Sequence, residues 1–335
     1  MPLMRLLAGL SLAAALATTP ALAQPTEVTM ALDWTPNTNH IGLFVAEAKG
    51  FYEEAGLAVE ILPYSDTSAG TLVANGVADF GILGSIGLFT QRTAGVDLVA
   101  TYALVQTETG RLVFNGERAD IQSPRDLDGK TYAGFGSNWE NALIGTIIRA
   151  DGGEGEFETV TLGTSAYEAL ANGAVDFTLE VYTWEGVKAE RDGRAQRSFR
   201  YADWGVPDQH TNFIGTTGAY LTEHPDTAKA FIGASQRGYA YAVAHPDEAT
   251  DILVAANSDA LLDRDFVRAS LQALIDGHYL EAENGAVGLI DPAKMEAMGT
   301  FLFEAGILKD GDGNPLAAKP DFSGYYTNAY LDDAP

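Results

Sequence analysis

The stretches TSAGTLVANGVADFGIL (residues 67–83) and TSAYEALANGAVDFTLE (residues 164–180) are two copies of one pattern. Each copy runs from Thr-Ser-Ala through a short helical segment to Ala-Asn-Gly, and then from Asp-Phe into an apolar strand. Thr67 and Thr164 are predicted to cap the two helices, and the Asn-Gly glycines suit the left-handed turn that ends a helix. Because the sequence holds no third copy, we expect one such unit in each of two similar lobes.

Helical and strand patterns alternate on both sides of the first copy, which is typical of a doubly wound α/β layer. The second copy belongs to a similar layer, which is predicted to begin near a strand at 131–135 and to end at about Tyr201. Prolines at the first helical position predict helices that begin at Pro225 and Pro246. Around the first copy we expect strands at 27–33, 58–63, 80–83 and 98–102, and helices at 39–49, 68–74 and 85–94.

The predicted fold class is therefore α/β, with two lobes of doubly wound sheets joined by two crossover strands. The crossovers are expected near 107–114 and 209–218. The predicted domain organisation is a discontinuous first lobe and a continuous second lobe, with the first at 24–110 and 215–335 and the second at 111–214.

Residues 1–23 have the pattern of a secretory signal peptide. A single basic residue, Arg5, precedes an apolar run at 6–17, and Ala21-Leu22-Ala23 forms an A-x-A cleavage site. The apolar run is too short to span a membrane. We therefore expect export, cleavage after Ala23 and a location in the periplasm.

The composition excludes several classes of function. The chain has no cysteine, which removes disulfides and thiol chemistry, and its five histidines show no metal-ligand spacing. A net charge of −26 favours solubility and argues against binding to nucleic acid or to anionic membrane surfaces. The sequence indicates neither a metal site nor a bound cofactor.

The first predicted strand ends in LDWTPNTNH (residues 32–40), a cluster of polar and aromatic groups. Ligands of open α/β sheets bind beyond the carboxyl ends of the strands. An indole can stack on a flat heteroaromatic ring, and carboxylate, amide and imidazole groups can bind its polar edge. The alternative is that the asparagines only cap the turn and the helix. The candidate ligand-binding residues of this stretch are Asp33, Trp34, Asn37, Asn39 and His40.

Three further segments supply candidates from other strand ends. Ser85 begins the helix after the third strand, where free backbone N–H groups can face a ligand; the alternative is a routine helix cap. Gly136, Ser137 and Asn138 are expected at a similar helix entry, which can hold an anion or a neutral amide group; the lack of Lys and Arg in this stretch favours the uncharged group. The segment LEVYTWEG (residues 179–186) is rich in aromatic and acidic groups, and its candidate ligand-binding residues are Tyr182, Trp184 and Glu185. Glu180 is the second choice of carboxylate. The alternative role of Trp184 is packing between the lobes.

The stretch LDWTPNTNHIGLFVAEAKGFYEEAGLAVEILPYSD (residues 32–66) is similar to the N-terminal signature of the thiamin-pyrimidine family. The segments VADFGI, DLDGKTYAGFG and YTNAYL resemble that family's layout, and also that of sulfonate, nitrate and riboflavin-type binding proteins. The resemblance covers nearly the whole mature chain. It implies the two-lobe, type II fold of the periplasmic binding proteins that serve ABC importers.

The family includes binding proteins for formyl-aminopyrimidine thiamin precursors and a yeast-type enzyme that makes the pyrimidine. That enzyme carries a cysteine-rich motif and a loop histidine, whereas this chain has no cysteine and reads GSIGLF (residues 84–89) in the corresponding loop. The resemblance therefore implies capture without catalysis and delivery to an ABC permease and ATPase. Riboflavin, a sulfonate or nitrate are alternative ligands; a pyrimidine-synthase-like enzyme and a ligand-sensing domain are alternative functions.

Overall fold

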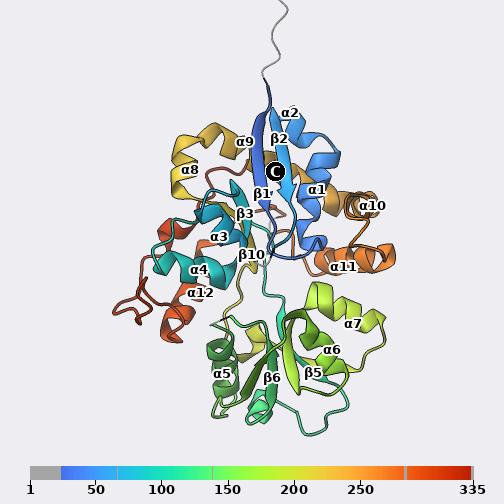
Figure 1. The fold of residues 1–335 in the computed structure, drawn as a ribbon, viewed down its shortest axis with the longest axis vertical. Helices are drawn as coiled ribbons and strands as arrows, with labels where there is room; N and C mark the ends of the chain where they lie inside the picture. Colours follow the sequence, from blue (N-terminus) through green and yellow to red (C-terminus); the bar gives the residue numbers. More distant parts are fainter. Residues whose placement is uncertain (1–23, 66, 138, 283–284, 333–335) are drawn as a thin grey trace, which may run out of the picture.

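The chain forms two lobes, each built around its own β-sheet (Figure 1). The structure is a computed structural model that describes residues 24–65, 67–137, 139–282 and 285–332. The predicted signal peptide at residues 1–23 lies outside the described residues. The expected α/β fold, with two doubly wound sheets and two crossovers between them, is confirmed.

The first sheet has the strand order β2-β1-β3-β10-β4. Its first three strands are parallel, and β10 runs antiparallel to both β3 and β4. The strand β10 follows the second lobe in the chain, so the chain returns from that lobe to the first sheet through β10. The strands are β1 (Thr26–Ala31), β2 (Leu57–Leu62), β3 (Phe80–Gly84), β4 (Val99–Ala103) and β10 (Asn212–Thr216).

The second sheet repeats this topology with the order β7-β6-β8-β5-β9. Here β5, which enters from the first lobe, is the strand that runs antiparallel to its neighbours β8 and β9. Each sheet thus receives one antiparallel strand from the chain that crosses between the lobes. The strands are β5 (Gly110–Asn115), β6 (Thr131–Gly134), β7 (Glu158–Thr161), β8 (Phe177–Val181) and β9 (Gln196–Arg200).

The aspartate of the sequence repeat has the same structural role in both sheets. The carboxylate of Asp79, just before β3, accepts hydrogen bonds from the backbone N–H and the hydroxyl of Thr29 on β1, at 2.7 and 2.9 Å. In the second sheet, Asp176 precedes β8 and accepts from the backbone N–H of Thr131 on β6, at 2.8 Å. Asp79 therefore fixes β3 beside β1, and Asp176 fixes β8 beside β6 in the same way, which explains why the pattern occurs twice.

The helix ends of the repeat follow the prediction only in part. Gly76 and Gly173 adopt positive φ angles of 67° and 71° at the helix ends, as expected. The prediction that Thr67 and Thr164 cap the helices is wrong. Ser68 caps α3 instead, because its hydroxyl accepts a hydrogen bond from the N–H of Thr71, and Thr164 lies inside a short 3₁₀ helix (Gly163–Ser165) that precedes α6.

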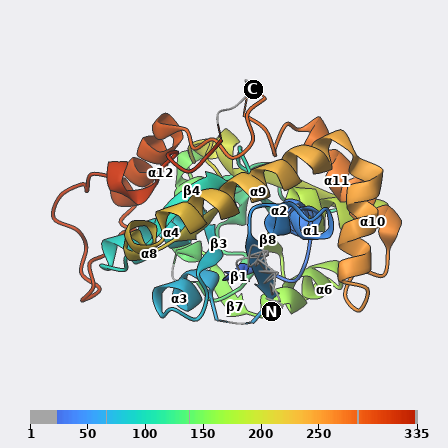
Figure 2. The same cartoon turned by 90° about the horizontal axis from the view of Figure 1, so that it is seen from above.

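Helices cover both faces of the first sheet, and Figure 2 shows the long helix α9 crossing this lobe beside α1 and α2. The backbones of α1 and α9 approach closely, since a Cβ atom on Gly238 would lie 2.0 Å from the carbonyl oxygen of Gly42. The helices predicted to begin at Pro225 and Pro246 are confirmed. The helices of this lobe are α1 (Ile41–Ala48), α2 (Phe51–Glu54), α3 (Ala69–Ala74), α4 (Ser85–Thr93), α8 (Gly218–Glu223), α9 (Pro225–Ala244), α10 (Pro246–Ala256), α11 (Arg264–Asp276) and α12 (Pro292–Glu304).

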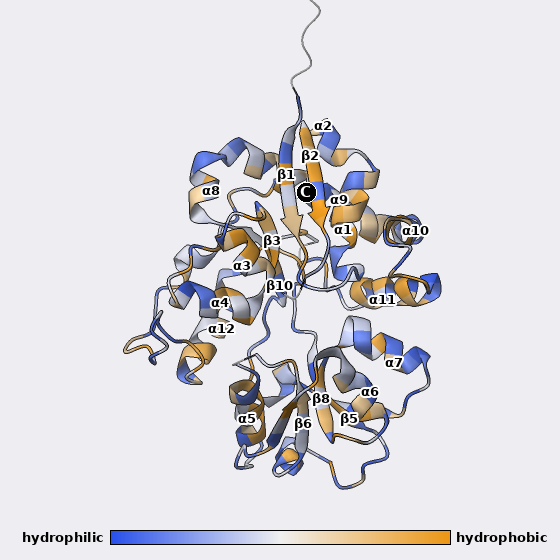
Figure 3. Ribbon diagram, in the orientation of Figure 1, coloured by the Kyte–Doolittle hydropathy of each residue, from blue (hydrophilic) through white to orange (hydrophobic). Residues whose placement is uncertain are grey.

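The second lobe is smaller, and its helices are α5 (Glu140–Ala150), α6 (Ala166–Ala171) and α7 (Val187–Arg191). Figure 3 shows the amphipathic arrangement, with hydrophobic residues along β2 and hydrophilic residues on the outer turns of α7. Within the described residues, no helix has both the length and the apolar character that crossing a membrane requires.

The two connections between the lobes run side by side. The backbone N–H of Leu104 donates to the carbonyl of Asn212, at 2.9 Å, and that of Thr211 donates to Val105, at 3.1 Å. Farther along, Glu108 on the first connection accepts a hydrogen bond from Gln209 on the second. This paired ribbon places the ends of both sheets against one another. The domain boundaries at residues 110 and 214 stay a prediction.

Candidate ligand-binding site

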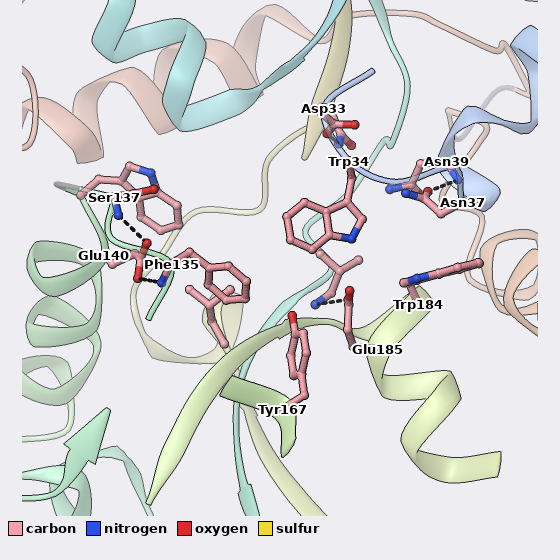
Figure 4. A pocket seen from close by; sticks show the side chains of 14 residues that line it. Asp33, Trp34, Asn37, Asn39, Phe135, Ser137, Glu140, Tyr167, Trp184 and Glu185 are labelled. Carbon is pink, nitrogen blue, oxygen red and sulfur yellow. Dashed lines mark hydrogen bonds between the residues drawn. The ribbon is translucent and has the colours of Figure 1, made fainter. Parts of the chain in front are cut away.

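A pocket of about 240 Å³ lies between the two lobes, and both sheets contribute to it (Figure 4). The first lobe lines it with the loop after β1 and with the start of β10. The second lobe lines it with the β6–α5 turn, with α6, and with the end of β8 and the turn that follows. The lining residues are Asp33, Trp34, Asn37, Asn39 and Asn212 from the first lobe, and Phe135, Ser137, Trp139, Glu140, Tyr167, Leu179, Val181, Trp184 and Glu185 from the second.

The carboxylate of Asp33 holds the loop after β1 in place. One oxygen accepts from Nε2 of His40, at 2.8 Å, and the other accepts from the side-chain amide of Asn212 on β10, at 2.9 Å. The other ring nitrogen of His40, Nδ1, accepts from the backbone N–H of Asn37, at 3.3 Å. Nε2 therefore carries the proton. His40 is fully buried behind the pocket, so it positions Asp33 and does not line the cavity.

The two asparagines of this loop differ in their side-chain contacts. The side chain of Asn37 caps the short 3₁₀ helix Thr38–His40, since its oxygen accepts from the N–H of Asn39, at 2.9 Å. Its amide also donates to the carbonyl of Thr35, at 3.0 Å. The side-chain amide of Asn39 has no hydrogen bond to a described residue and faces the pocket. Asn37 therefore acts in the loop's structure, whereas Asn39 has hydrogen-bonding groups to offer.

The indole of Trp34 extends from the first lobe toward the second (Figure 4). Its ring meets Phe135 of the second lobe edge to face, with 6.0 Å between the ring centroids, and meets Tyr64 of its own lobe at 5.7 Å. Tyr167 and Glu185 lie on the other side of the cavity. The pocket thus offers aromatic surface from both lobes to a flat ring.

Glu140 fixes the turn between β6 and α5, and it was not among the residues predicted from the sequence. Its buried carboxylate accepts from the N–H groups of Phe135 and Ser137, at 2.9 and 2.8 Å, and from the hydroxyl of Tyr132, at 2.8 Å. A Ser-x-x-Glu pattern at 137–140 precedes the helix, and this capping signature was the available signal. Because its hydrogen bonds are all internal, Glu140 orients the turn.

Glu185 and Glu180 bring two further carboxyl groups to this side of the cavity. Burial raises the pKa of Glu185 to about 7, and Glu180 adds to the shift, although the N–H of Val181 donates to Glu185 at 3.3 Å. Burial also raises the pKa of Glu180 to about 7, against the opposing effect of Arg111. Two carboxyl groups with such pKa values can each exchange a proton with a basic ligand near neutral pH.

The turn that carries Trp184 and Glu185 is a short π-helix, Tyr182–Gly186. Trp184 lines the pocket and also packs on Phe266 of the first lobe, with 4.4 Å between the ring centroids. Both roles considered from the sequence, ligand contact and interlobe packing, are therefore geometrically available to Trp184. Short π-helical turns are frequent at functional sites.

A buried hydrogen-bonded bridge joins the lobes beside this turn. The hydroxyl of Ser270 on α11 donates to the carbonyl of Thr183 in the second lobe, at 2.5 Å. The same hydroxyl lies 2.6 Å from that of Thr38 in the first lobe. All three residues are buried, so the bridge connects the loop after β1 to the turn after β8.

Some predicted residues lie away from the pocket lining. Ser85 is buried at the start of α4, and its N–H donates to the carbonyl of Thr211. Gly136 is exposed with a φ of 88°, next to Ser137, which does line the pocket. The ring of Tyr182 lies against the guanidinium of Arg111, 3.6 Å from its centroid. Asn138 lies outside the described residues.

Four lining residues were not predicted from the sequence: Asn212, Phe135, Trp139 and Tyr167. Phe135 and Trp139 flank the predicted turn at 136–138, whereas Asn212 and Tyr167 lie in an ordinary strand and helix that no local pattern marks. The described residues contain no group of three or more histidine, cysteine and carboxylate side chains arranged to hold a metal ion.

Two sheets of matched topology, paired crossovers and a pocket between the lobes define the class of type II periplasmic binding protein folds. The sequence pattern of the family described as NMT1/THI5 like matches residues 37–249. The chain belongs to this family.

Three known proteins show the range of similarity. A formylaminopyrimidine-binding protein of Halalkalibacterium halodurans is 28% identical over 82% of this chain and 84% of that protein. A 4-amino-5-hydroxymethyl-2-methylpyrimidine phosphate synthase of Legionella pneumophila is 24% identical over 68% of this chain and 73% of that protein. The structure of the periplasmic aliphatic sulphonate-binding protein SsuA of Escherichia coli superposes with a TM-score of 0.67, at 16% identity, over 90% of this chain and 92% of that one.

The raised pKa of Glu180 predicts a specific pH dependence of stability. The pKa is about 7 in the folded protein against a reference value of 4.5, so between these values the folded state binds more protons than the unfolded state. Stability must then fall as the pH rises through this window. Glu180→Gln removes this effect and should raise the free energy of unfolding at pH 8 by about 2–3 kcal/mol, with little change at pH 4.

Urea unfolding at both pH values measures this difference. Glu190→Gln is the comparison variant, because Glu190 is an exposed carboxylate on α7 in the same lobe. Its charge is a smaller cause of the raised pKa of Glu180 than burial is, so this variant should be stabilised less at pH 8. Equal stabilities of wild type and Glu180→Gln at pH 8 would contradict the prediction.

Proposed function

We propose that the protein captures a small heteroaromatic solute, an aminopyrimidine thiamin precursor, between its lobes. It then delivers the solute to an ABC permease and ATPase for uptake. The observation that carries the proposal is the composition of the pocket. Aromatic rings line it from both lobes, carboxyl groups stand at its edges, and no lysine or arginine is among its lining residues.

The proposed binding mode follows from the chemistry of the ring. Trp34 contacts the face of the ring, where offset stacking and edge-to-face contacts are both favourable. Glu185 pairs with the edge that carries a ring nitrogen beside an exocyclic amine, as two parallel hydrogen bonds when the nitrogen is protonated. The raised pKa of Glu185 supports this pairing, because the carboxyl and the ring nitrogen can share one proton near neutral pH. The carboxylate of Asp33 accepts hydrogen bonds from the remaining polar groups of the ligand, and the side-chain amide of Asn39 can donate to them or accept from them.

The absence of lysine and arginine from the lining also favours a neutral or cationic ligand over an anion. A sulfonate or nitrate would have to be buried beside Asp33, Glu140 and Glu185 with no opposite charge, which is costly. Riboflavin is an uncharged heteroaromatic, and it is the second candidate ligand.

Capture without chemistry is the proposed mode of action, although relatives that are pyrimidine phosphate synthases share the fold. The sequence has no cysteine, and the loop after β3 reads Gly-Ser-Ile-Gly-Leu-Phe without a histidine, which the yeast-type enzymes carry there. Closure of the lobes around the ligand is the proposed motion. The proposed location is the periplasm, after removal of residues 1–23.

The first test of this function is ligand binding by thermal shift and calorimetry. Aminopyrimidine thiamin precursors should raise the melting temperature, because a ligand that binds only the folded state adds about 2.7 kcal/mol at one hundred times its Kd. Glu185→Gln should weaken binding by about 1.5–3 kcal/mol, the range for a hydrogen bond to a charged group. Glu190→Gln, with its carboxylate on the outer surface of α7, should leave the affinity unchanged.

Three results would count against the proposal. Stabilisation by sulfonates or nitrate with no response to aminopyrimidines would exclude the ligand class. Equal affinity of wild type and Glu185→Gln would place the ring elsewhere in the pocket. Conversion of the bound pyrimidine, detected by mass spectrometry, would favour the enzyme over the binding protein.

The interlobe bridge at Ser270 yields a test of closure. Ser270→Ala leaves the pocket lining intact but removes the hydroxyl that joins Thr38 to Thr183. The open form should then be more populated, so affinity should fall by about 0.5–1.5 kcal/mol. Small-angle scattering of the ligand-free protein should give a larger radius of gyration.

Ser235→Ala is the matched control. Ser235 is as deeply buried as Ser270, but its hydroxyl bonds to Tyr52 and Phe231 within the first lobe. This variant should lose stability without changing the radius of gyration or the affinity. If the two serine variants behave alike in scattering and binding, the bridge has no role in closure.

A further inference from the structure

A second cavity lies directly beside the pocket between the lobes. Its volume is about 330 Å³, and four residues line both cavities: Trp34, Tyr167, Trp184 and Glu185. We call the second cavity the side compartment. The two cavities are adjacent, with these four side chains between them, so a ring held in the pocket lies next to the side compartment.

Glu180 lines the side compartment and is only 4% exposed. No described residue donates a hydrogen bond to its carboxyl. Arg111 is paired with Glu180 across strands β5 and β8, but its guanidinium lies over the ring of Tyr182 instead. A nearly buried residue that lines a cavity thus has a carboxyl without a hydrogen-bond donor from the described residues.

The other two buried glutamates of this region are satisfied internally. Glu140 is 2% exposed and accepts three hydrogen bonds. Glu108 is 7% exposed and accepts from the N–H of Gly110 and from the amide of Gln209. Buried polar groups are normally paired, and leaving one unpaired is costly. Glu180 is nearly buried and lines the side compartment without such a donor, so a bound group that carries a donor would complete its interactions.

The charges around the side compartment determine the chemical class of that group. Lys188 and Arg194 also line it, but both are paired with Asp192. Their side chains are 44% and 41% exposed, so solvent screens both charges, and both share the one carboxylate of Asp192. The carboxyl of Glu180 has no cationic partner within 4.0 Å among the described residues. A group that carries hydrogen-bond donors complements this carboxyl.

We propose that the side compartment is a second subsite, in which Glu180 binds an amine-bearing arm of the ligand while the ring occupies the main pocket. This inference rests on the proposed function, and it adds that the ligand carries an amine-bearing substituent on its ring. Glu185 lies at the junction, where it lines both cavities. The ring-binding carboxyl and the arm-binding carboxyl are then two different residues.

The test compares two probes that differ only in the arm: 4-amino-2,5-dimethylpyrimidine and 4-amino-5-aminomethyl-2-methylpyrimidine. Calorimetry gives the Kd of each probe for wild type, Glu180→Gln and Glu190→Gln. In wild type the aminomethyl probe should bind more tightly than the dimethyl probe. Glu180→Gln should weaken the aminomethyl probe about 10- to 100-fold and change the dimethyl probe by about twofold or less. Glu190→Gln should preserve the preference.

The calorimetry results distinguish failure of the subsite proposal from failure of the proposed function. If the dimethyl probe binds wild type as tightly as the aminomethyl probe, or if Glu180→Gln weakens both probes equally, the subsite is overturned while the proposed function stands. If neither probe binds wild type, the proposed function fails, and the subsite fails with it. Urea unfolding of Glu180→Gln shows that a selective loss of the aminomethyl probe does not come from misfolding.

Discussion

The pocket depends on the two hydrogen bonds that the carboxylate of Asp33 accepts. The carboxylate receives one hydrogen bond from His40 in the loop after β1 and one from Asn212 at the start of β10. The first bond folds the loop back on itself, and the second ties the loop to the strand that returns from the other lobe. Trp34 and Asn39 extend from this loop into the pocket. This one partly buried hydrogen-bonded cluster therefore sets where the first lobe's ligand-binding groups lie relative to the interlobe crossing.

The second lobe organises its carboxyl groups in a different way. Glu140, and Glu108 on the connection that enters this lobe, accept internal hydrogen bonds, so each fixes a segment of backbone: the turn before α5 and the connection into β5. Glu180 and Glu185 keep hydrogen-bonding capacity toward the cavities, and burial raises the pKa of both. Buried groups of this kind lower stability, and they are typical of sites where a ligand completes the interactions. Glu140 and Glu108 therefore hold the backbone of the site in place, whereas Glu180 and Glu185 remain able to bind a ligand.

The sequence predicted the parts of the molecule that local patterns encode. The Asp-Phe repeat marked the third strand of each sheet, because Asp79 and Asp176 make the same bonds to neighbouring strands. The polar stretch after β1 marked one wall of the pocket. In the first copy the helix cap lies one residue later than predicted, at Ser68, since serine follows threonine there and either hydroxyl can serve. In the second copy Ser165 precedes α6 without a side-chain capping hydrogen bond.

The remaining parts of the site depend on contacts between distant segments, which no local pattern specifies. Asn212 reaches the pocket because β10 returns beside β3, and Tyr167 because α6 packs at the same end of the second sheet. Ser85 was predicted at the pocket from its place at a strand end, but its N–H is used by Thr211 on the returning segment. Trp184 combines a ligand-facing position with packing on Phe266, and only the three-dimensional structure shows both.

We propose that a flat heteroaromatic ring binds between the lobes, with Trp34 at its face and Glu185 at its edge. A crystal structure of the protein grown with an aminopyrimidine thiamin precursor would show this binding mode. We expect the ring in the pocket, within hydrogen-bonding distance of the Glu185 carboxyl and in contact with the Trp34 indole. A ring bound outside the interlobe pocket, or held there without either residue, would contradict it.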